Sequence, residues 1–297
     1  MASRAPSPVA LAAIPARLSD FVQLGKPRLS ALVLVTAAGG MWLAPGHLAP
    51  VKAAIALAMT TLAVAAANAL NAYLERDTDA LMHRTRTRPL PAGRLEPRAA
   101  LVFGVTLAAA SVASLVFSVN PLCGALAAVA IVSYVAVYTP MKYQSPHAVI
   151  VGALPGAIPP LLGWTAVTGR IGPGGLALAA ILFVWQLPHF LAIALYLKDD
   201  YARAGIRVLP LTHGDRATRA CIALYSLLLV PVTLALPRLH VAGPKYFFAA
   251  AVLGAGFLGW SATGLQAGAG KRWARGLMLA SVAYLTLLFA ALALDVA

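Results

Sequence analysis

The sequence predicts an all-α membrane protein with nine transmembrane helices. Its 297 residues are 61% hydrophobic and only 11% charged, a composition too apolar for an ordinary soluble domain. Stretches of about 20 apolar residues, the length that crosses the hydrocarbon core of a bilayer, recur along the whole chain. The basic residues fall mostly into alternate connecting segments, as expected when successive helices cross a membrane in opposite directions.

Nine apolar stretches account for most of the chain. In order, we expect spans over 29–45, 51–74, 99–119, 121–139, 147–168, 174–197, 220–237, 245–266 and 276–295. Because the connecting segments are short, residues 21–297 are predicted to form a single membrane domain. Residues 1–20 hold scattered prolines and lack the uninterrupted apolar core of a cleaved signal peptide, so we expect a short flexible cytoplasmic tail there.

The net charge of +14 is explained by topology, and we expect no nucleic-acid partner. Of the 23 Lys and Arg residues, only Lys52, Arg170, Arg238 and Lys245 fall on the side of the lipid bilayer opposite the N-terminus. This bias places the N-terminus in the cytoplasm and the C-terminus across the membrane. The alanine-rich composition favours a bacterial inner membrane, and an organellar transit peptide at the N-terminus is the alternative.

Five of the nine acidic residues cluster at two predicted helix ends that face the cytoplasm. The first cluster closes the second span and comprises Asn68, Asn71, Glu75, Asp77 and Asp79. If the helix continues through it, all of these except Asp77 are spaced three and four residues apart and share one face. Polar groups on one face near a membrane span are by default functional.

The first cluster predicts a site for a metal ion and a diphosphate. Carboxylates packed this closely raise one another's pKa unless a counter-charge is present. Mg²⁺ would supply that charge, because it commonly takes one or two carboxylates and completes its shell with substrate phosphates. Arg84, Arg86 and Arg88 could bind the remaining phosphate oxygens through paired hydrogen bonds. The alternative is a solvated, charged helix end, since topology alone would explain the arginines.

The second cluster ends the sixth span and consists of Lys198, Asp199, Asp200 and Tyr201. It lies four spans after the first cluster, and both lead into a loop with arginines and a Leu-Pro pair. This similarity suggests an internal duplication, since many membrane folds are built from repeats. Two facing acidic helix ends could bind metal ions on either side of one diphosphate.

The run NAYLERDTDALMHRTRTRPLP resembles the first aspartate-rich motif of the UbiA superfamily of intramembrane prenyltransferases. In that motif an Asn, an acid four residues later and an Asp after four more match Asn71, Glu75 and Asp79. The resemblance implies nine helices around a central cavity and the use of Mg²⁺, with two ions expected, to ionise a prenyl diphosphate. The nine spans counted from hydropathy agree with it independently.

Three further stretches resemble the haem-farnesylating members of that superfamily. They are Lys26-Pro27-Arg28, the segment from Tyr138 to Gly169 and the segment from Trp185 to Pro210. The likeness covers residues from about 22 to 215, and spans seven to nine match in hydropathy alone. Departures lie near the loops: His147 stands where Asn is expected, Arg207 replaces an expected Pro, and Lys142 lacks a second basic neighbour.

The resemblance implies two substrates, farnesyl diphosphate and haem b, so haem b would be a substrate and not a cofactor. A vinyl group of haem b would accept the farnesyl group to give haem O. The predicted catalytic residues are Asn71, Glu75, Asp79 and Asp200, which together with Asp77 and Asp199 are the predicted metal ligands. The predicted diphosphate-binding residues are Lys26, Arg28, Arg84, Arg88, Lys142 and Lys198. A haem A synthase or a cytochrome oxidase assembly protein would be the protein partner.

The candidate haem-binding residues are His189, His147, Trp185 and Tyr201. On the sixth span, Trp185, His189 and the pair Asp199–Asp200 fall near one helical stripe, so we expect His189 to face the diphosphate cavity. Histidine is a usual axial ligand of haem iron, although a lone His in a span is also often a packed core residue. Aromatic faces such as Trp185, Tyr138 or Tyr201 could stabilise an allylic cation.

The fifth span carries Pro155, Pro159 and Pro160, which are expected to break or bend it. Its glycines, Gly152, Gly156 and Gly163, either allow close helix packing or shape a cavity wall.

Two other functions fit parts of the sequence. A secondary transporter also has broken helices, a repeat and intramembrane polar residues. In a transporter the polar residues gather at the membrane midplane, whereas in this sequence they gather at one membrane face. A prenyltransferase acting on an aromatic quinone precursor would need a DxxxD second site. Arg203 stands where the second of those acids would be, which disfavours that activity.

Overall fold

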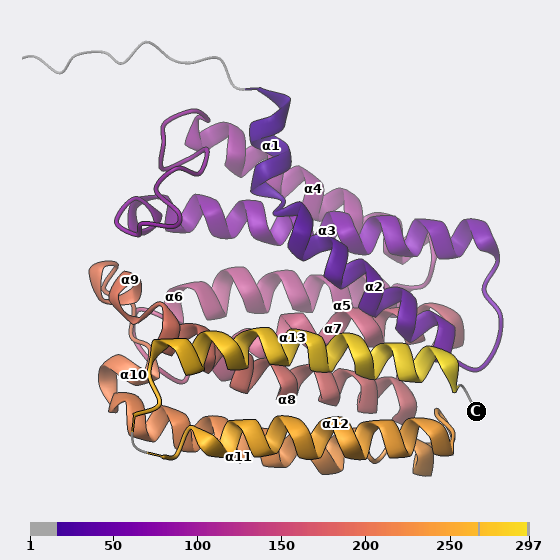
Figure 1. The fold of residues 1–297 in the computed structure, drawn as a ribbon. Helices are drawn as coiled ribbons and strands as arrows, with labels where there is room; N and C mark the ends of the chain where they lie inside the picture. The colour runs from indigo at the N-terminus through magenta and orange to yellow at the C-terminus, as the bar shows by residue number, and fades with distance from the viewer. Residues whose placement is uncertain (1–16, 267, 296–297) are drawn as a thin grey trace, which may run out of the picture.

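The computed structural model describes residues 17–266 and 268–295. Positions 1–16 of the predicted flexible tail lie outside these residues, and helix formation begins at Leu18, before the predicted end of the tail. The elements are α1 (Leu18–Leu24), α2 (Pro27–Leu43), α3 (Pro50–Asp79), α4 (Pro97–Ser118), α5 (Pro121–Val132), the π-helix η1 (Ser133–Tyr138), α6 (Thr139–Met141), α7 (Ala148–Thr168), α8 (Pro173–Tyr196), α9 (Lys198–Arg203), α10 (Leu209–Thr212), α11 (Gly214–Thr233), the 3₁₀-helix η2 (Pro237–Leu239), α12 (Pro244–Thr263) and α13 (Lys271–Leu294). No β-strand occurs in the described part of the chain, so the all-α prediction is confirmed (Figure 1).

Each predicted span corresponds to a helix of the structure. Among the described residues, eight helical segments are long and apolar enough to cross a membrane, and α2 adds a shorter apolar helix over Leu29–Leu43. Three helices run five or six residues beyond their predicted ends, because Glu, Lys and Arg in the charged flanks are themselves good helix formers. α3 continues to Asp79, α11 begins at Gly214 and α13 begins at Lys271.

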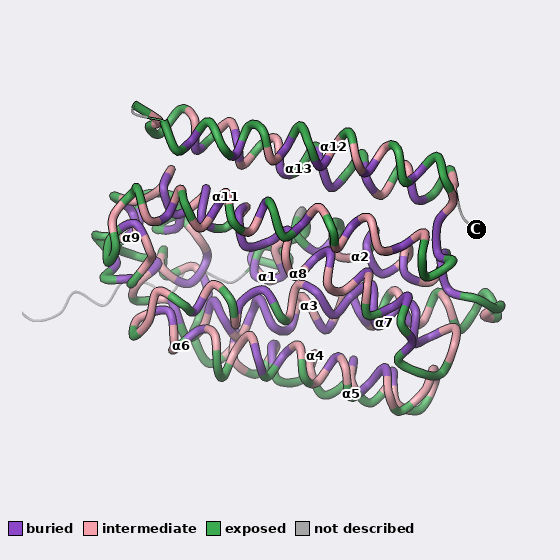
Figure 2. Tube along the Cα trace, turned by 90° about the horizontal axis from the view of Figure 1, so that it is seen from below, coloured by how far each residue is buried: buried purple, intermediate pink, exposed green. Residues whose placement is uncertain are grey.

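The outer surface of the bundle is apolar. Large side chains such as Val35, Phe117 and Val252 are exposed on helix faces that point away from the other helices, and Figure 2 shows the buried residues on the inward faces. Apolar patches of this extent are not left exposed to water by soluble monomers. The chain is therefore a multi-pass membrane protein.

The bundle is centred on α7, which has the largest buried share of any span. α3 packs against α4 on one side of the bundle and α11 packs against α12 on the other, with α7 and α8 between them (Figure 1). The three prolines of α7 do not break it, since the helix runs continuously from Ala148 to Thr168. Neighbouring helices commonly make such prolines tolerable within a membrane bundle.

Glycines let α2 cross α7 at very short range. A Cβ atom at Gly163 would lie 2.0 Å from the carbonyl oxygen of Ala37, and one at Gly40 would lie 2.0 Å from that of Pro160. Neither backbone oxygen could move away without disturbing its helix. For Gly163, close packing is therefore the correct interpretation.

Both acidic clusters lie at the same end of the bundle. The loop after α3, residues 80–96, and the short helices α9 and α10 share the end opposite the C-terminus (Figure 1). Met82 of the first loop packs with Ala204 and Ile206, which follow the second cluster. The two predicted acidic helix ends therefore meet through their loops.

Candidate active site

One face of α3 carries the buried polar residues of the first cluster. Because the helix continues to Asp79, the side chains of Asn68, Asn71, Glu75 and Asp79 fall on one face, and all four are buried. Asp77 points away from this face, its side chain is 86% exposed, and it pairs with the adjacent Arg76. The prediction of a shared face is confirmed, and Asp77 stands outside the set.

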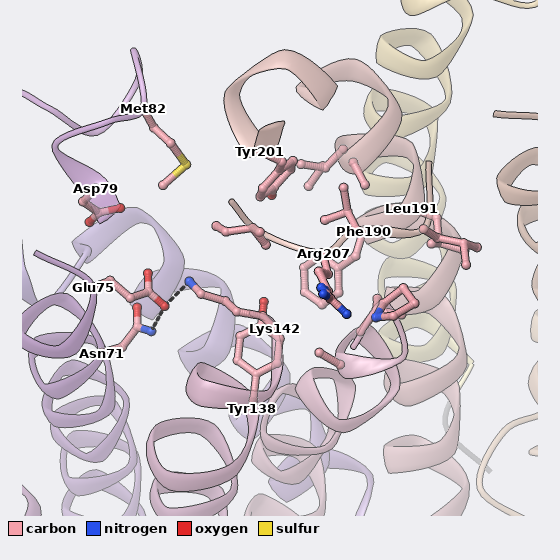
Figure 3. Close-up of a pocket in the computed structure, with 18 of the residues that line it drawn as sticks. Asn71, Glu75, Asp79, Met82, Tyr138, Lys142, Phe190, Leu191, Tyr201 and Arg207 are labelled. Carbon is pink, nitrogen blue, oxygen red and sulfur yellow. Dashed lines mark hydrogen bonds and ion pairs between the residues drawn. The ribbon is translucent and has the colours of Figure 1, made fainter. Parts of the chain in front are cut away.

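A cavity of about 250 Å³ opens beside this face of α3. Asn71, Glu75 and Asp79 form one wall, and the other wall comes from α8 and the segment after it, with Phe190, Tyr201 and Arg207 (Figure 3). Four of the predicted diphosphate-binding residues, Lys26, Arg84, Arg88 and Lys142, also line it. The cavity thus joins a carboxylate wall to five basic side chains, a combination suited to a metal ion and an anionic group.

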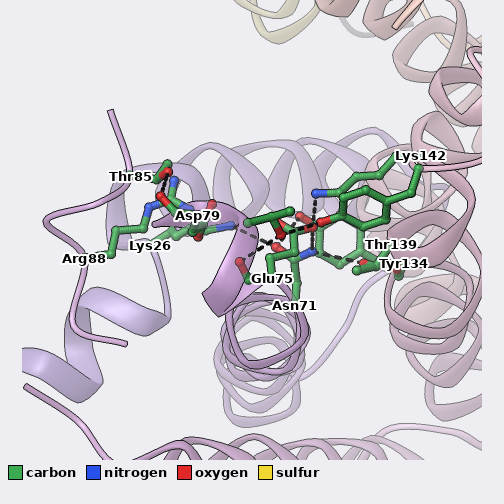
Figure 4. A network of polar contacts seen from close by, with 11 residues as sticks. Lys26, Asn71, Glu75, Asp79, Thr85, Arg88, Tyr134, Thr139 and Lys142 are labelled. Atoms are coloured by element: carbon green, nitrogen blue, oxygen red, sulfur yellow. Dashed lines mark hydrogen bonds and ion pairs between the residues drawn. The ribbon is translucent and has the colours of Figure 1, made fainter. Parts of the chain in front are cut away.

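The two buried carboxylates already have cationic partners. Glu75 accepts from Lys142 Nζ and from Asn71 Nδ2, while Asp79 Oδ2 accepts from Arg88 Nη1 at 2.8 Å (Figure 4). Side-chain cations therefore balance these carboxylates here, and charge balance alone does not require a metal ion.

Asn71 connects the two sides of this network. Its Oδ1 accepts weakly from Lys26 Nζ and from Tyr134 Oη, each at 3.4 Å, and its Nδ2 donates to Thr139 Oγ1 at 3.0 Å. α3 is thereby tied to the segment η1–α6, which supplies Tyr134 and Thr139.

The oxygen atoms present fit a single divalent cation. Asp79 Oδ1 is buried and has no hydrogen-bond partner among the described residues, which leaves a carboxylate oxygen available as a ligand. Asp79 lines the same cavity as Glu75 and Asn71, whose side-chain oxygens are also hard donors of the kind that Mg²⁺ takes together with substrate phosphates. The six predicted ligands do not gather, and no group of three or more His, Cys, Asp or Glu side chains is placed to hold a metal in the described part of the chain.

The second cluster is arranged differently from the prediction. Asp200 is buried, pairs with Arg203, and accepts weakly from the backbone N–H of His83 at 3.4 Å, so it joins the two loops without lining the cavity. Asp199 is exposed and pairs with Lys271, with 2.6 Å between Oδ2 and Nζ. Lys198 pairs with Asp215 at 2.6 Å and also lies off the cavity.

A break in the helix explains this difference. α8 ends at Tyr196, and a separate helix, α9, begins at Lys198 after Leu197 leaves helical geometry with φ −104° and ψ 25°. The predicted helical face, which assumed one continuous helix from Trp185 to Asp200, therefore does not extend into α9. Of the second cluster, only Tyr201 reaches the cavity, where it stands 5.9 Å from the guanidinium of Arg84.

The prediction that His189 faces the diphosphate cavity is wrong. Its ring stacks on Trp185 with centroids 4.9 Å apart, and its Nδ1 lies 2.7 Å from Ser281 Oγ of α13. Trp185 Nε1 donates to the carbonyl of Ser281 at 2.7 Å. The face of α8 that lines the cavity instead carries Phe190, Leu191 and Ala194, since residues 190 and 194 lie about 140° around the helix from 185 and 189.

His147 and Arg28 are the remaining residues predicted to bind substrate. His147 is exposed just before α7, beside the cavity-lining Pro146 and Ala148, and its ring centroid is 6.4 Å from that of His213. The side chain of Arg28 is outside the described set.

An apolar cavity of about 250 Å³ adjoins the polar one. Tyr134, Tyr138 and Phe190 line both cavities, and most other residues of the second are aliphatic or glycine. At Gly152 a Cβ atom would lie 2.7 Å from the ring of Tyr138, so this glycine makes room for the tyrosine. Gly152 and Gly156 both line the cavity, and a Cβ atom at Gly156 would lie 2.0 Å from Gln186 Oε1 of α8, so both sequence interpretations apply to these residues.

Sequence reasoning missed several cavity residues. Tyr134 lies in the π-helix η1, whose wider turn changes which side chains face the cavity and is typical of functional sites. Tyr134 and Tyr138 stack there with centroids 5.5 Å apart. Arg207 was noted only as a departure from the family. A signal for Tyr134 existed, because it precedes the YTPMK stretch by one helical turn.

The lowered pKa of Lys26, a residue that lines the polar cavity, predicts that diphosphate binding depends on pH. It precedes the first span, and burial, followed by the charge of Arg88, lowers the pKa of its amine to about 8. A lowered lysine pKa means that the positive charge is present below pH 8 and is lost as the pH rises. We expect KM for a prenyl diphosphate to rise by about tenfold through this range, the order of one lost charged hydrogen bond. Steady-state kinetics of Lys26→Arg, which stays charged, should lack this rise, and an identical profile in both proteins would contradict the assignment.

The hydrogen bonds of Arg94 between α1 and the loop after α3 predict a second effect on substrate binding. Arg94 donates to Asp20 Oδ1 at 3.0 Å and to the carbonyl of Thr87 at 3.0 Å, next to the cavity residue Arg88. Arg94→Met should therefore displace the loop and raise KM for a prenyl diphosphate by about tenfold, with a smaller change in kcat. The control is Arg86→Met, since Arg86 is exposed and does not line the polar cavity. Equal kinetics in both variants would show that the hydrogen bonds of Arg94 have no part in substrate binding.

The fold and the site together define an intramembrane enzyme of the prenyltransferase class. The chain belongs to the UbiA prenyltransferase family, whose sequence pattern matches residues 33–293. It is 57% identical over 273 residues to a protein from an Anaeromyxobacter species named protoheme IX farnesyltransferase, with 92% of each chain covered. It is 53% identical to the protein of the same name from Myxococcus xanthus, covering 95% of this chain and 96% of that one.

A solved structure shares the fold. It is a UbiA homolog from Archaeoglobus fulgidus bound to GPP and Mg²⁺, with a TM-score of 0.63 at 16% identity. The alignment covers 92% of this chain and 99% of that one.

Proposed function

We propose that this protein transfers the farnesyl group of farnesyl diphosphate to a vinyl group of haem b, giving haem O and diphosphate. The observation that carries the proposal is the junction of two cavities, one lined by carboxylates and basic side chains and the other apolar. Such a junction accommodates an amphiphile with a charged head and an isoprenoid tail. The identity of more than 50% to two proteins named protoheme IX farnesyltransferase supports the choice of substrates.

The diphosphate would lie in the polar cavity, among the side chains of Lys26, Arg84, Arg88, Lys142 and Arg207. These groups bind its oxygens and stabilise the charge that develops as the carbon–oxygen bond breaks. Arg207 is included because its backbone N–H donates to the carbonyl of Lys142 at 3.0 Å, which holds the segment after α9 beside α6. Lys198, directed toward Asp215, has no part in this contact.

Mg²⁺ would be held by Asn71, Glu75 and Asp79, with substrate phosphate oxygens completing its shell. When bound, the ion acts as a Lewis acid on the leaving diphosphate. The structural homolog that binds GPP and Mg²⁺ supports divalent metal use. The family resemblance implies two ions. A site for one of them is supported by Asp79 Oδ1, the buried carboxylate oxygen without a partner among the described residues. Lys142 and Arg88, which balance Glu75 and Asp79 here, would then turn toward the diphosphate.

Heterolysis leaves an allylic cation at the junction of the two cavities. The rings of Tyr134, Tyr138 and Phe190 line this junction, and aromatic faces stabilise cations held against them. The apolar walls exclude water that would otherwise capture the cation before the acceptor does. The vinyl group then forms the new carbon–carbon bond, and the cation left on the acceptor adds water with loss of a proton.

Haem b would reach the junction beside Tyr201, the haem candidate that lines the polar cavity. His189 and Trp185 lie on the α13 side of α8, so iron ligation by His189 would place the macrocycle between α8 and α13. Iron ligation by His189 predicts that His189→Ala weakens haem binding, measured by the absorbance of the bound haem, far more than farnesyl diphosphate binding. Ser281→Ala, which removes the contacts of the hydroxyl with the ring and with the carbonyl of Met278 but keeps the histidine, is the control. Equal losses for both substrates in His189→Ala would assign the histidine to packing.

The cellular setting is part of the same proposal. The alanine-rich composition supports a bacterial inner membrane, and the distribution of basic residues supports a cytoplasmic N-terminus and an active site at the cytoplasmic face. A haem A synthase or a cytochrome oxidase assembly protein remains the proposed partner, because haem O must be passed on within the membrane.

The test of the reaction class is turnover by the purified protein in detergent, without a transmembrane gradient. We expect diphosphate release that requires haem b and stops when a chelator removes divalent cations. Release that continues in chelator would overturn the metal assignment. Transport into vesicles without any covalent product would favour a transporter, and turnover with an aromatic acid in place of haem b would favour a quinone-type enzyme.

A further inference from the structure

A second polar cavity lies at the end of the bundle opposite the active site. Its volume is about 680 Å³, and it is formed by the ends of α2 and α7, the start of α8 and the helix η2. Its charged lining residues are Arg170 and Arg238, and no Asp or Glu lines it within the described chain. This end of the bundle carries few cations, since the sequence predicts only Lys52 and Lys245 besides these two.

The two arginines have no partner of opposite charge. Neither guanidinium makes an ion pair or hydrogen bond with any residue of 17–266 or 268–295. Asp295, the acidic residue at this end, instead caps α12, where Tyr246 N donates to its Oδ2 at 2.7 Å. Arginine on this side of a membrane protein runs against the positive-inside bias. Two unpaired guanidiniums at one cavity therefore point to an anion from outside the chain.

The rest of the cavity suits a group at the membrane–water interface. Trp42 and Trp164 line it, and tryptophan is enriched where membrane helices meet the headgroups. The indole of Trp164 is fixed by glycines of α8: a Cβ atom at Gly174 would lie 2.3 Å from its ring. α8 begins here with Gly172 as its N-cap, which has no side chain to accept from the first-turn amides.

We propose that this cavity binds the phosphate headgroup of an anionic phospholipid from the leaflet opposite the active site. Arg170 and Arg238 bind the phosphate oxygens through charged hydrogen bonds, and the amide of Gly174 is available as a further donor. The apolar residues Leu43, Ile171 and Leu239, which also line the cavity, contact the start of the acyl chains. A lipid is favoured over soluble phosphate because this apolar lining would contribute nothing to binding a free ion. The proposal is independent of the reaction at the other end.

The experiment is native mass spectrometry of the protein released from nanodiscs of phosphatidylglycerol mixed with phosphatidylcholine. The variant is Arg170→Gln with Arg238→Gln, and the control is Lys52→Gln with Lys245→Gln. The control removes the same charge from exposed positions at the same end that do not line the cavity. We expect the native protein and the control to retain phosphatidylglycerol, and the arginine variant to retain at least about tenfold less.

Equal retention by the native protein and the arginine variant would overturn the proposal, as would an equal loss in the lysine control. Displacement of the phosphatidylglycerol by millimolar inorganic phosphate would assign the cavity to a soluble anion and would also overturn it. Circular dichroism of both variants separates loss of binding from loss of fold. An arginine variant with native helix content and no retained lipid supports the proposal.

Discussion

Replacing Asp79 with Asn is expected to abolish farnesyl transfer while leaving the protein folded. Asp79 is buried at the end of α3, one carboxylate oxygen pairs with Arg88, and the other has no partner among the residues described. The substitution keeps the shape of the side chain but removes the charge that would hold Mg²⁺. Loss of an electrostatic contact that acts in the transition state lowers kcat by at least about 100-fold.

Asp77→Asn is the matched control for this prediction. It makes the same chemical change two residues away, at a side chain that is 86% exposed and turned from the cavity. Turnover measured with saturating Mg²⁺ should be close to normal in Asp77→Asn and absent in Asp79→Asn, with similar thermal unfolding of both proteins. Comparable activities would remove Asp79 from the site, and loss of activity in Asp77→Asn would restore that residue as a ligand.

Removing the amine of Lys142 is expected to cost both stability and activity. The ion pair with Glu75 is buried, with side-chain exposures of 11% and 8%, so Lys142→Met leaves a carboxylate without its counter-charge. Breaking one partner of such a pair costs about 3–5 kcal/mol of unfolding free energy. Adding Glu75→Gln should recover much of the stability, because the uncompensated charge is gone. Activity should not return, since the diphosphate then loses a cation and the metal a ligand.

The exposed ion pair of Lys271 with Asp199 is the control for the stability cost of breaking the buried pair. Both side chains are more than half exposed, so Lys271→Met should cost less than about 1 kcal/mol. Stability is followed by thermal unfolding in detergent and activity by diphosphate release. Recovery of activity together with stability in the double variant would mean that Glu75 and Lys142 serve the fold alone.

The fold follows from the sequence to a large extent, because hydropathy decides which segments cross a bilayer. The shared face of α3 was also predictable, since it depends only on helical spacing that continues to Asp79. Sequence could not place the charged partners of Glu75 and Asp79, which lie 67 and 9 residues away and are brought in by the packing of α6 and the loop after α3.

The second cluster shows where helical spacing fails. The geometry of Leu197 separates α8 from α9, and no proline or glycine marks that break in the sequence. The positions of Asp199 and Asp200 depend on this break, whereas the orientation of His189 toward α13 is set within α8 itself. The π-helix η1 is a similar case, because its wider turn changes which side chains face the cavity, and no residue type in the sequence marks it.

The most direct test of the central claim is the mass of the haem after reaction. Purified protein is incubated with haem b, farnesyl diphosphate and Mg²⁺, and the extracted haem is analysed by mass spectrometry. The proposed reaction predicts a product heavier than haem b by one farnesyl group and one hydroxyl, absent with Asp79→Asn. Unmodified haem b from protein that still binds farnesyl diphosphate, or farnesyl transfer to a different acceptor under these conditions, would contradict it.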